Sequence, residues 1–127
     1  MGKDAYRDFV EHPRYGRRPR ITGLNPAADY EAGVFLHWHS PNEARIRNTA
    51  IAADLSRQTP STVPVTHYFD LRRQCRSCGR PFLFFADEQK YWHEELGFDL
   101  ASDCVRCVGC RKARRGLAQD LARYEAL

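Results

Sequence analysis

The chain has 127 residues, of which 43% are hydrophobic, 12% aromatic and 28% charged, with a formal net charge of +4 and a mean hydropathy of -0.63. This composition excludes a disordered chain and predicts one small globular domain, whose modest core a bound metal would supplement. No stretch approaches the roughly 18 apolar residues of a membrane span and the first residues do not resemble a signal peptide, so we expect a cytoplasmic protein without a membrane partner.

The first thirty residues show no regular hydrophobic period. Prolines and glycines interrupt them repeatedly, at Pro13, Gly16, Pro19, Gly23 and Pro26. Such residues break helices and strands, so residues 1–30 are predicted to form a basic, Pro/Arg-rich arm or extended wrap.

Residues 31–64 are predicted to form a second segment. Its apolar run at 33–38 suits a short strand, and the spacing over 42–56 indicates a helix, although Asn48 and Thr49 are poor helix formers. Prolines and hydroxyl residues over 58–64 predict a loop that joins this segment to the remainder of the chain.

Residues 65–127 are predicted to form the metal-binding domain. Two strands are expected at 65–71 and 81–85, followed by a helix over 88–96 with Asp87 at its start and Gly97 as its C-cap. A final helix is expected over 108–124. Because Leu117, Leu121 and Tyr124 share its i, i+4, i+7 spacing, we expect them to form a buried stripe.

Two cysteine pairs carry the strongest chemical signal. Cys75-x2-Cys78 and Cys107-x2-Cys110 are separated by 28 residues, a spacing that brings four thiolates to one tetrahedral zinc ion. Protein ligands would fill all four positions, which predicts a structural Zn²⁺ and not a catalytic one. Gly79 follows the first pair and suits the turn of a zinc knuckle.

Several motifs together resemble a known family. They are Cys75-x2-Cys78-Gly79, the aromatic run at 82–85, Glu88-Gln89 followed by Tyr91-Trp92, Gly97-Phe98 and Arg106-Cys107-x2-Cys110-Arg111. Over residues 68–115 they look like the bacterial family called the probable zinc-ribbon domain, a treble-clef-like module. The resemblance implies a small α+β fold, with a β-hairpin and helices around one site of four cysteines, and implies no substrate or activity. Ala86-Asp87 departs from the hydroxyl residue common before the Glu-Gln pair in that family.

Cys104 permits a second interpretation. Cys104, Cys107 and Cys110 imitate part of a ferredoxin-type iron-sulfur run, but no fourth cysteine follows at the required distance. Zinc is therefore favoured, with Cys104 as a spare or buried thiol.

His37 and His39 alternate along the first predicted strand, so both imidazoles would share one face and could hold a second metal. Glu43 and His67 are the available third ligands, and packing histidines beside Trp38 are the simpler interpretation. No catalytic motif or phosphate-cradling glycine loop is present, so we expect no enzyme and no small-molecule substrate.

Positive charge is segregated into stretches without acids. If the two cysteine pairs share one metal, these stretches become neighbours, and the sequence predicts a surface that binds nucleic acid, RNA in preference to duplex DNA. The proposed contacts are Arg17, Arg18, Arg20, Arg72, Arg73, Arg76, Arg111, Lys112, Arg114 and Arg115. Two alternatives stay open: an adaptor within a protein complex that docks through the acidic segment 87–95 and the arm, and a treble-clef nuclease that uses His37, His39 or His67.

Overall fold

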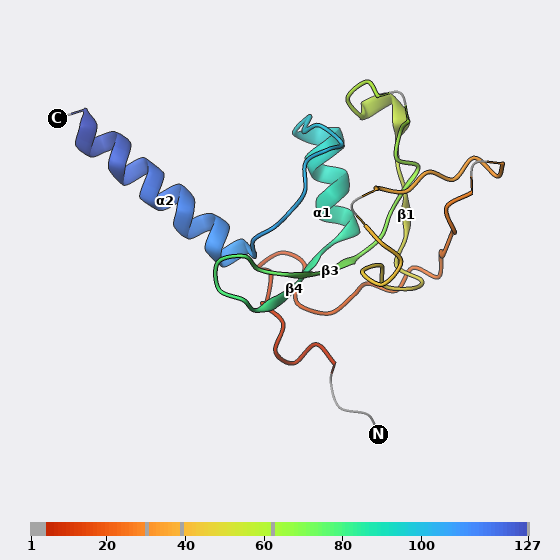
Figure 1. Ribbon diagram of the computed structural model, residues 1–127, viewed down its shortest axis with the longest axis horizontal. Coiled ribbons are helices and arrows are strands. Elements are labelled where there is room, and N and C mark those ends of the chain that lie inside the picture. The colour runs from red at the N-terminus through yellow and green to blue at the C-terminus, as the bar shows by residue number, and fades with distance from the viewer. Residues whose placement is uncertain (1–4, 30, 39, 62, 127) are drawn as a thin grey trace.

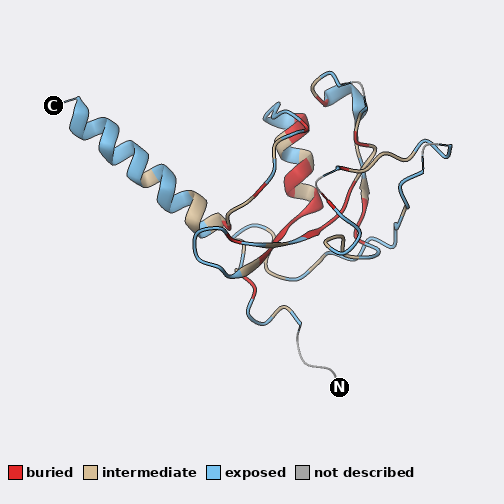
Figure 2. Ribbon diagram, in the orientation of Figure 1, coloured by how far each residue is buried: buried red, intermediate tan, exposed pale blue. Residues whose placement is uncertain are grey.

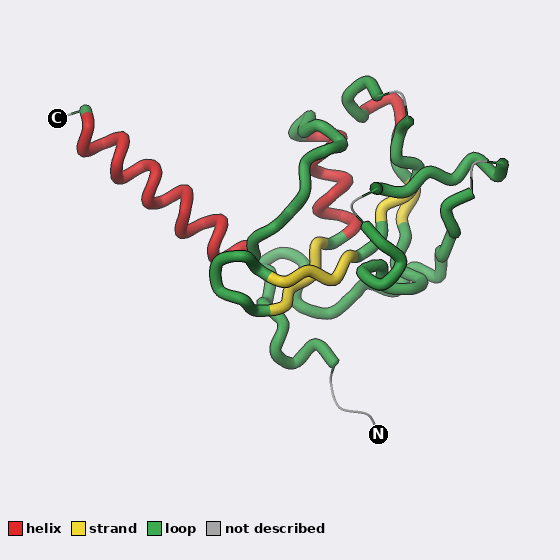
Figure 3. Tube along the Cα trace, in the orientation of Figure 1, coloured by secondary structure: helices red, strands yellow, loops and turns green. Residues whose placement is uncertain are grey.

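The computed structural model describes residues 5–29, 31–38, 40–61 and 63–126 and has a small α+β fold (Figure 1). Much of the described chain is loop, and the regular elements cluster in its second half (Figure 3). The strands are β1 (Ile51–Ala52), β2 (His67–Tyr68), β3 (Leu71–Gln74) and β4 (Pro81–Phe84). The helices are the 3-10 turn η1 (Leu55–Arg57), α1 (Ala86–Lys90), its π-helical continuation η2 (Tyr91–Glu95) and α2 (Val108–Glu125).

The strands pair as two antiparallel sheets of two strands each. β1 pairs with β2, with Ile51 opposite Tyr68, and β3 pairs with β4, with Leu71 opposite Phe84. The strand expected over 65–71 is thus divided between β2 and β3, whereas β4 lies where the second strand was expected.

Both faces of β4 are buried. Since side chains alternate across a strand, Phe82 and Phe84 join one core cluster and Leu83 joins another, which contains Phe9. Burial on both faces explains why the sequence here is continuously apolar rather than alternating. Phe9 comes from the N-terminal segment, which therefore supplies part of the cover of the hairpin.

The N-terminal segment is irregular and packs on the metal-binding half. Val10 N donates to the carbonyl of Pro81 at 2.9 Å, and Arg20 N donates to the carboxylate of Asp70 at 2.9 Å. The segment therefore runs along the domain as a wrap (Figure 1). It does not project as a free arm over the residues described.

Asp70 organises the start of α1. Its side chain is buried and accepts hydrogen bonds from Ala86 N at 2.7 Å and Arg20 N. Ala86 N is an orphan donor at the first position of the helix, so Asp70 caps α1 from outside its own sequence neighbourhood. The helix begins two residues before the expected start and continues through η2 to Gly97, which has φ 72° as expected of its C-cap position.

The predictions of a strand and a helix within residues 31–64 are wrong. Residues 33–38 form no strand beyond an isolated bridge at Val34, and residues 42–56 form turns, an isolated bridge at Arg45, β1 and η1 in place of a helix. Asn48 has φ 63°, a left-handed conformation that no α-helix contains. The hydroxyl of Thr49 donates to Ile46 O and accepts from Asp70 N, so a polar side chain replaces the helical ladder.

α2 lies where the final helix was expected but projects from the body of the molecule (Figure 1). Its surface is exposed along almost the whole length (Figure 2). The predicted burial of its stripe is wrong, since Leu117, Leu121 and Tyr124 are 70%, 58% and 76% exposed. Within the described part of the chain, no helix is both long enough and apolar enough to cross a membrane.

Candidate metal centre

The first two cysteines lie in the turn between β3 and β4. Cys75 N donates to Arg80 O at 3.0 Å, and Gly79 N donates to Cys75 O at 3.0 Å, so the turn closes on itself. Gly79 has φ 76°, a conformation that glycine adopts at the lowest cost. This is the knuckle expected from the sequence.

The second pair lies at the start of α2. Cys107 is the N-cap of the helix and Cys110 lies in its first turn, where Arg111 N donates to Cys107 O at 2.9 Å. The partial positive charge of a helix N-terminus favours thiolates at these positions.

The four sulfur atoms fit one zinc ion. The Sγ atoms of Cys75, Cys78, Cys107 and Cys110 all lie within 4.8 Å of one another, and Cys78 Sγ lies 3.9 Å from Cys107 Sγ. Zinc–sulfur bonds of about 2.3 Å in a tetrahedron place sulfur atoms about 3.8 Å apart. The site is a structural zinc centre whose four positions are all filled by protein.

Backbone N–H donors around Cys75 favour its thiolate form. Burial raises the pKa of the Cys75 thiol, but hydrogen bonds from the backbone of Cys78, Cys107 and Ser77 outweigh burial and lower it to about 6. Donors to sulfur stabilise the thiolate that zinc requires.

Cys104 lies outside this cluster. Its thiol is buried and donates to Arg106 O at 3.3 Å. Burial raises the pKa of Cys104 to about 12, and its sulfur is not among the four that lie close enough to share one ion. The prediction of a buried spare thiol is confirmed.

A hairpin knuckle and the first turn of a helix each supply two ligands, which is the arrangement of a treble clef. Residues 69–118 match the model of a family described as a probable treble clef domain. These residues have the treble-clef fold and are similar to that family, and we refer to residues 69–118 as the treble clef domain. No curated protein and no solved structure shows significant similarity to the chain. The match covers nearly the same residues as the resemblance seen in the sequence.

The Glu-Gln pair of the treble clef domain has a structural role. Glu88 Oε2 accepts from Arg111 Nη2 at 3.1 Å, which ties α1 to the first turn of α2. Gln89 Nε2 donates to the carbonyls of Phe69 and Phe84 at 2.6 and 2.9 Å, which ties α1 to β4 and to the residues between β2 and β3. Trp92 packs against Phe84. The guanidinium carbon of Arg111 lies over the Trp92 ring, 5.4 Å from the ring centroid.

The zinc centre brings the basic stretches together. Arg76 N donates to Val105 O at 2.9 Å, and Arg106 Nε donates to Ser77 Oγ at 2.9 Å, so the knuckle contacts the segment that leads into α2. Five of the ten predicted contact residues have exposed side chains in the treble clef domain, namely Arg72, Arg76, Lys112, Arg114 and Arg115. We call Arg76, Lys112, Arg114 and Arg115 the basic surface.

Other predicted contact residues are engaged within the fold. Arg20 pairs with Asp87 at 2.8 Å, Arg73 with Asp103 at 3.1 Å and Arg111 with Glu88 at 3.1 Å. Arg17 and Arg18 lie in the N-terminal wrap, half-buried and exposed respectively. The sequence offered no signal for these pairings, because each carboxylate lies at least 23 residues from its arginine.

The histidines lie apart from the zinc centre. His37 is buried, with its ring centroid 5.1 Å from that of His93 and 6.1 Å from that of Tyr68, while His39 is outside the described residues. His67 bonds the hydroxyl of Thr66, and burial lowers its pKa. Among the residues that the structure describes, the four cysteines are the only group that gathers three or more metal-ligating side chains.

Proposed function

We propose that the treble clef domain is a non-enzymatic module that binds single-stranded RNA, or a ribonucleoprotein, through the basic surface. The hydrogen bond from Arg76 N to Val105 O carries the proposal, because it places the knuckle beside the start of α2. Three arginines and one lysine from two distant parts of the sequence thereby gather around one zinc centre. Exposed cations neutralise phosphates, which supplies most of the affinity of such surfaces.

Charge distribution supports this choice. The sequence contains no acidic residue over 71–86 or over 104–119, so the knuckle and the first turns of α2 carry positive side chains alone. Lys112, Arg114 and Arg115 are exposed on a helix that projects into solvent (Figure 2). RNA is favoured over duplex DNA because the described residues contain no helix-turn-helix or repeated finger that could enter a major groove.

Salt titration tests the proposal. We would measure the affinity of the zinc-loaded chain for a fluorescently labelled single-stranded RNA at increasing salt concentration. Each phosphate contact contributes about -0.7 to the slope of log K against log salt. Loss of one contact in Arg114→Glu should therefore make the slope shallower by about 0.7 and weaken binding at low salt.

Arg57→Glu is the matched control, because it makes the same change in net charge on the exposed turn η1, outside the treble clef domain. It should leave the slope unchanged. An affinity that does not respond to salt, or an equal loss in both variants, would exclude RNA binding through the basic surface.

A protein adaptor is the second candidate function. The acidic segment expected to dock a partner offers little free charge, because Glu88 and Glu94 are buried and Asp87 and Glu95 are paired with Arg20 and Arg57. The exposed apolar stripe of α2 is the observation that favours an adaptor. If Leu117→Gln and Leu121→Gln abolish association with a purified partner while RNA affinity is unchanged, the adaptor function is supported.

A further inference from the structure

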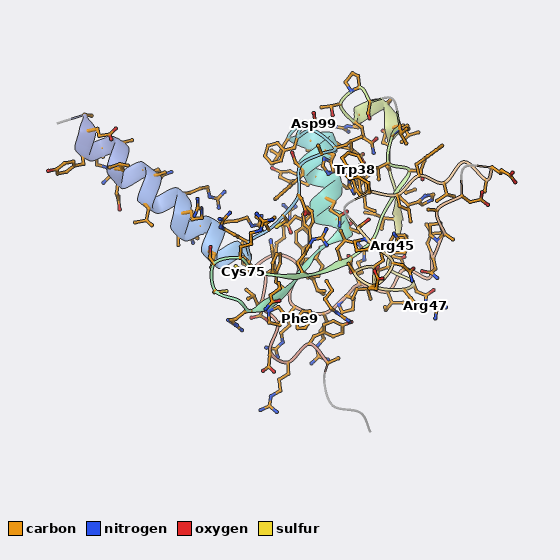
Figure 4. All side chains as sticks on the ribbon, in the orientation of Figure 1. Phe9, Trp38, Arg45, Arg47, Cys75 and Asp99 are labelled. Atoms are coloured by element: carbon orange, nitrogen blue, oxygen red, sulfur yellow. The ribbon has the colours of Figure 1, made fainter. Side chains whose placement is uncertain are left out.

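A cavity of about 440 Å³ opens in the first half of the chain, away from the zinc centre. Its lining comes from residues 25–27, from Asn42, Arg45 and Arg47, and from Phe69. Figure 4 shows Arg45 and Arg47 on the opposite side of the body from Cys75. Volumes of about 300–1,000 Å³ are typical of small-molecule sites.

Hydrogen bonds hold both walls in place. On one side, Thr22 N and Gly23 N donate to Asn48 O at 2.7 and 3.0 Å, and Asn48 N donates to Asn25 Oδ1 at 3.2 Å. Asn48 has φ 63°, a left-handed conformation that costs free energy for any residue other than glycine, so the surrounding hydrogen bonds must hold the turn in place. On the other side, Ile46 N donates to Asp70 O at 2.9 Å. The cavity is therefore formed before any ligand binds.

Two arginines line the same cavity. Arg45 lies at an isolated bridge and Arg47 in the turn that leads to Asn48, and both line the cavity. The Arg45 guanidinium is oriented by Ser40 O at 2.5 Å and Asn42 Oδ1 at 3.4 Å, and it lies 5.8 Å from the ring centroid of Phe69. An arginine has five N–H donors, so Arg45 keeps donors for a ligand. Arg47 is exposed, and within the described part of the chain its guanidinium makes no hydrogen bond or ion pair.

The remaining polar side chains also offer donors. Asn25 uses its Oδ1 to accept from Asn48 N, and Asn42 uses its Oδ1 to accept from Arg45. The NH₂ group of each amide is left for a ligand, and no described residue of the lining is acidic. A cavity whose side chains offer N–H groups and positive charge suits an anion with several acceptor oxygens.

We propose that this cavity binds the phosphate group of a nucleotide. Arg45 and Arg47 would hold the phosphate oxygens, and the volume leaves room for a sugar or base beside Pro26 and Ala27. The phosphate could arrive on a free nucleotide or within an RNA strand, since the group recognised is the same. The site does not depend on the basic surface, because none of its residues lies in the knuckle or α2.

The test uses the zinc-loaded full chain and isothermal titration with adenosine monophosphate, with adenosine as the probe that lacks phosphate. Adenosine monophosphate should bind at least about tenfold more tightly than adenosine, and Arg47→Gln should weaken its binding about tenfold. Arg47 makes no contact that the fold requires, so its variant should keep the wild-type melting temperature. Arg57→Gln removes an exposed arginine outside the cavity and should leave binding unchanged.

A second arm separates the two sources of phosphate. If Arg47→Gln weakens binding of a single-stranded RNA while adenosine monophosphate does not bind, the site takes a nucleotide within RNA. If the mononucleotide binds and RNA affinity is unchanged, it takes a free nucleotide. The inference is overturned if Arg47→Gln changes neither affinity. Arg114 lies outside the cavity, so the effect of Arg114→Glu on RNA affinity tests the basic surface independently of the cavity.

Discussion

The buried carboxylate of Glu88 accepts hydrogen bonds from Arg111 Nη2 and from His12 Nε2, each at 3.1 Å. One side chain on α1 thus joins the residue that follows zinc ligand Cys110 to the N-terminal wrap. Three stretches of chain meet at this oxygen, because His12 and Arg111 lie 76 and 23 residues from Glu88 in the sequence. The metal centre and the wrap are therefore parts of one folding unit.

Replacing Glu88 tests this relationship. Glu88→Gln leaves the guanidinium of Arg111 half-buried without its anion, and loss of one partner of such a pair costs about 3 kcal/mol. Chemical unfolding of the zinc-loaded protein measures the loss. Glu95→Gln is the matched control, because the Glu95–Arg57 pair at 2.9 Å is exposed and contributes at most about 1 kcal/mol. Equal losses would show that Glu88 does not link the two regions.

The cysteines should divide into two groups. Cys107→Ser removes a ligand and should cost much of the binding free energy of a structural zinc, which is on the order of 10 kcal/mol. Cys104→Ser should keep one zinc per chain and cost about 1 kcal/mol, because the hydroxyl can still donate to Arg106 O. Metal content and thermal unfolding check both variants. Loss of zinc from the Cys104 variant would contradict the assignment of ligands.

Asp70 should make stability depend on pH. Burial raises the pKa of its carboxyl from 3.8 to about 6 in the folded protein. Between these values the folded state binds more protons than the unfolded state, so stability falls as pH rises from about 4 to about 6 and is level above that range. A shift of this size corresponds to about 3 kcal/mol.

The variant Asp70→Asn removes this titration. Protonation of the zinc ligands at low pH affects both proteins, so the difference between their unfolding free energies isolates Asp70. That difference should change between about pH 4 and pH 6 and be constant above about pH 6.5. A difference that stays constant across the whole range would show that the Asp70 carboxyl does not titrate there.

The exposed stripe of α2 should contribute little to folding. Leu117→Gln should change the unfolding free energy by no more than about 0.5 kcal/mol, as is usual for exposed positions. Leu71→Ala, which removes a buried side chain from the hairpin, should cost about 3 kcal/mol. A large loss in Leu117→Gln that grows with protein concentration would show that the stripe is buried between copies of the chain.

The zinc site was predictable because its determinants are local. Each Cys-x2-Cys pair lies in one turn, and a single ion demands that the pairs meet, so spacing alone identified the ligands. The last helix was predictable for a similar reason, since its period and composition act within a few turns. Periodicity identifies an apolar face of a helix but does not show whether another part of the protein covers that face. The prediction that Leu117 is buried was wrong for this reason.

The first half of the chain was not predictable, because its contacts are distant in sequence. The segment around Asn48 has helical spacing, yet its backbone is set by Thr22, Asn25 and Asp70. Likewise Arg45 and Arg47 carry no motif, and they line a cavity only because residues 25–27 fold against them. Tertiary contacts outweigh intrinsic propensity in such segments.

Only the beginning of α2 is anchored, through Cys107, Cys110 and Arg111, while the rest extends into water. The part of α2 beyond Arg111 is short enough to be marginal by itself in water, so its order must spread outward from the anchored turn. The zinc ion consequently acts as the nucleus of this helix. Amide protons near Arg111 will exchange slowest, those near Tyr124 fastest, and removal of the ion will erase the gradient along with the helix.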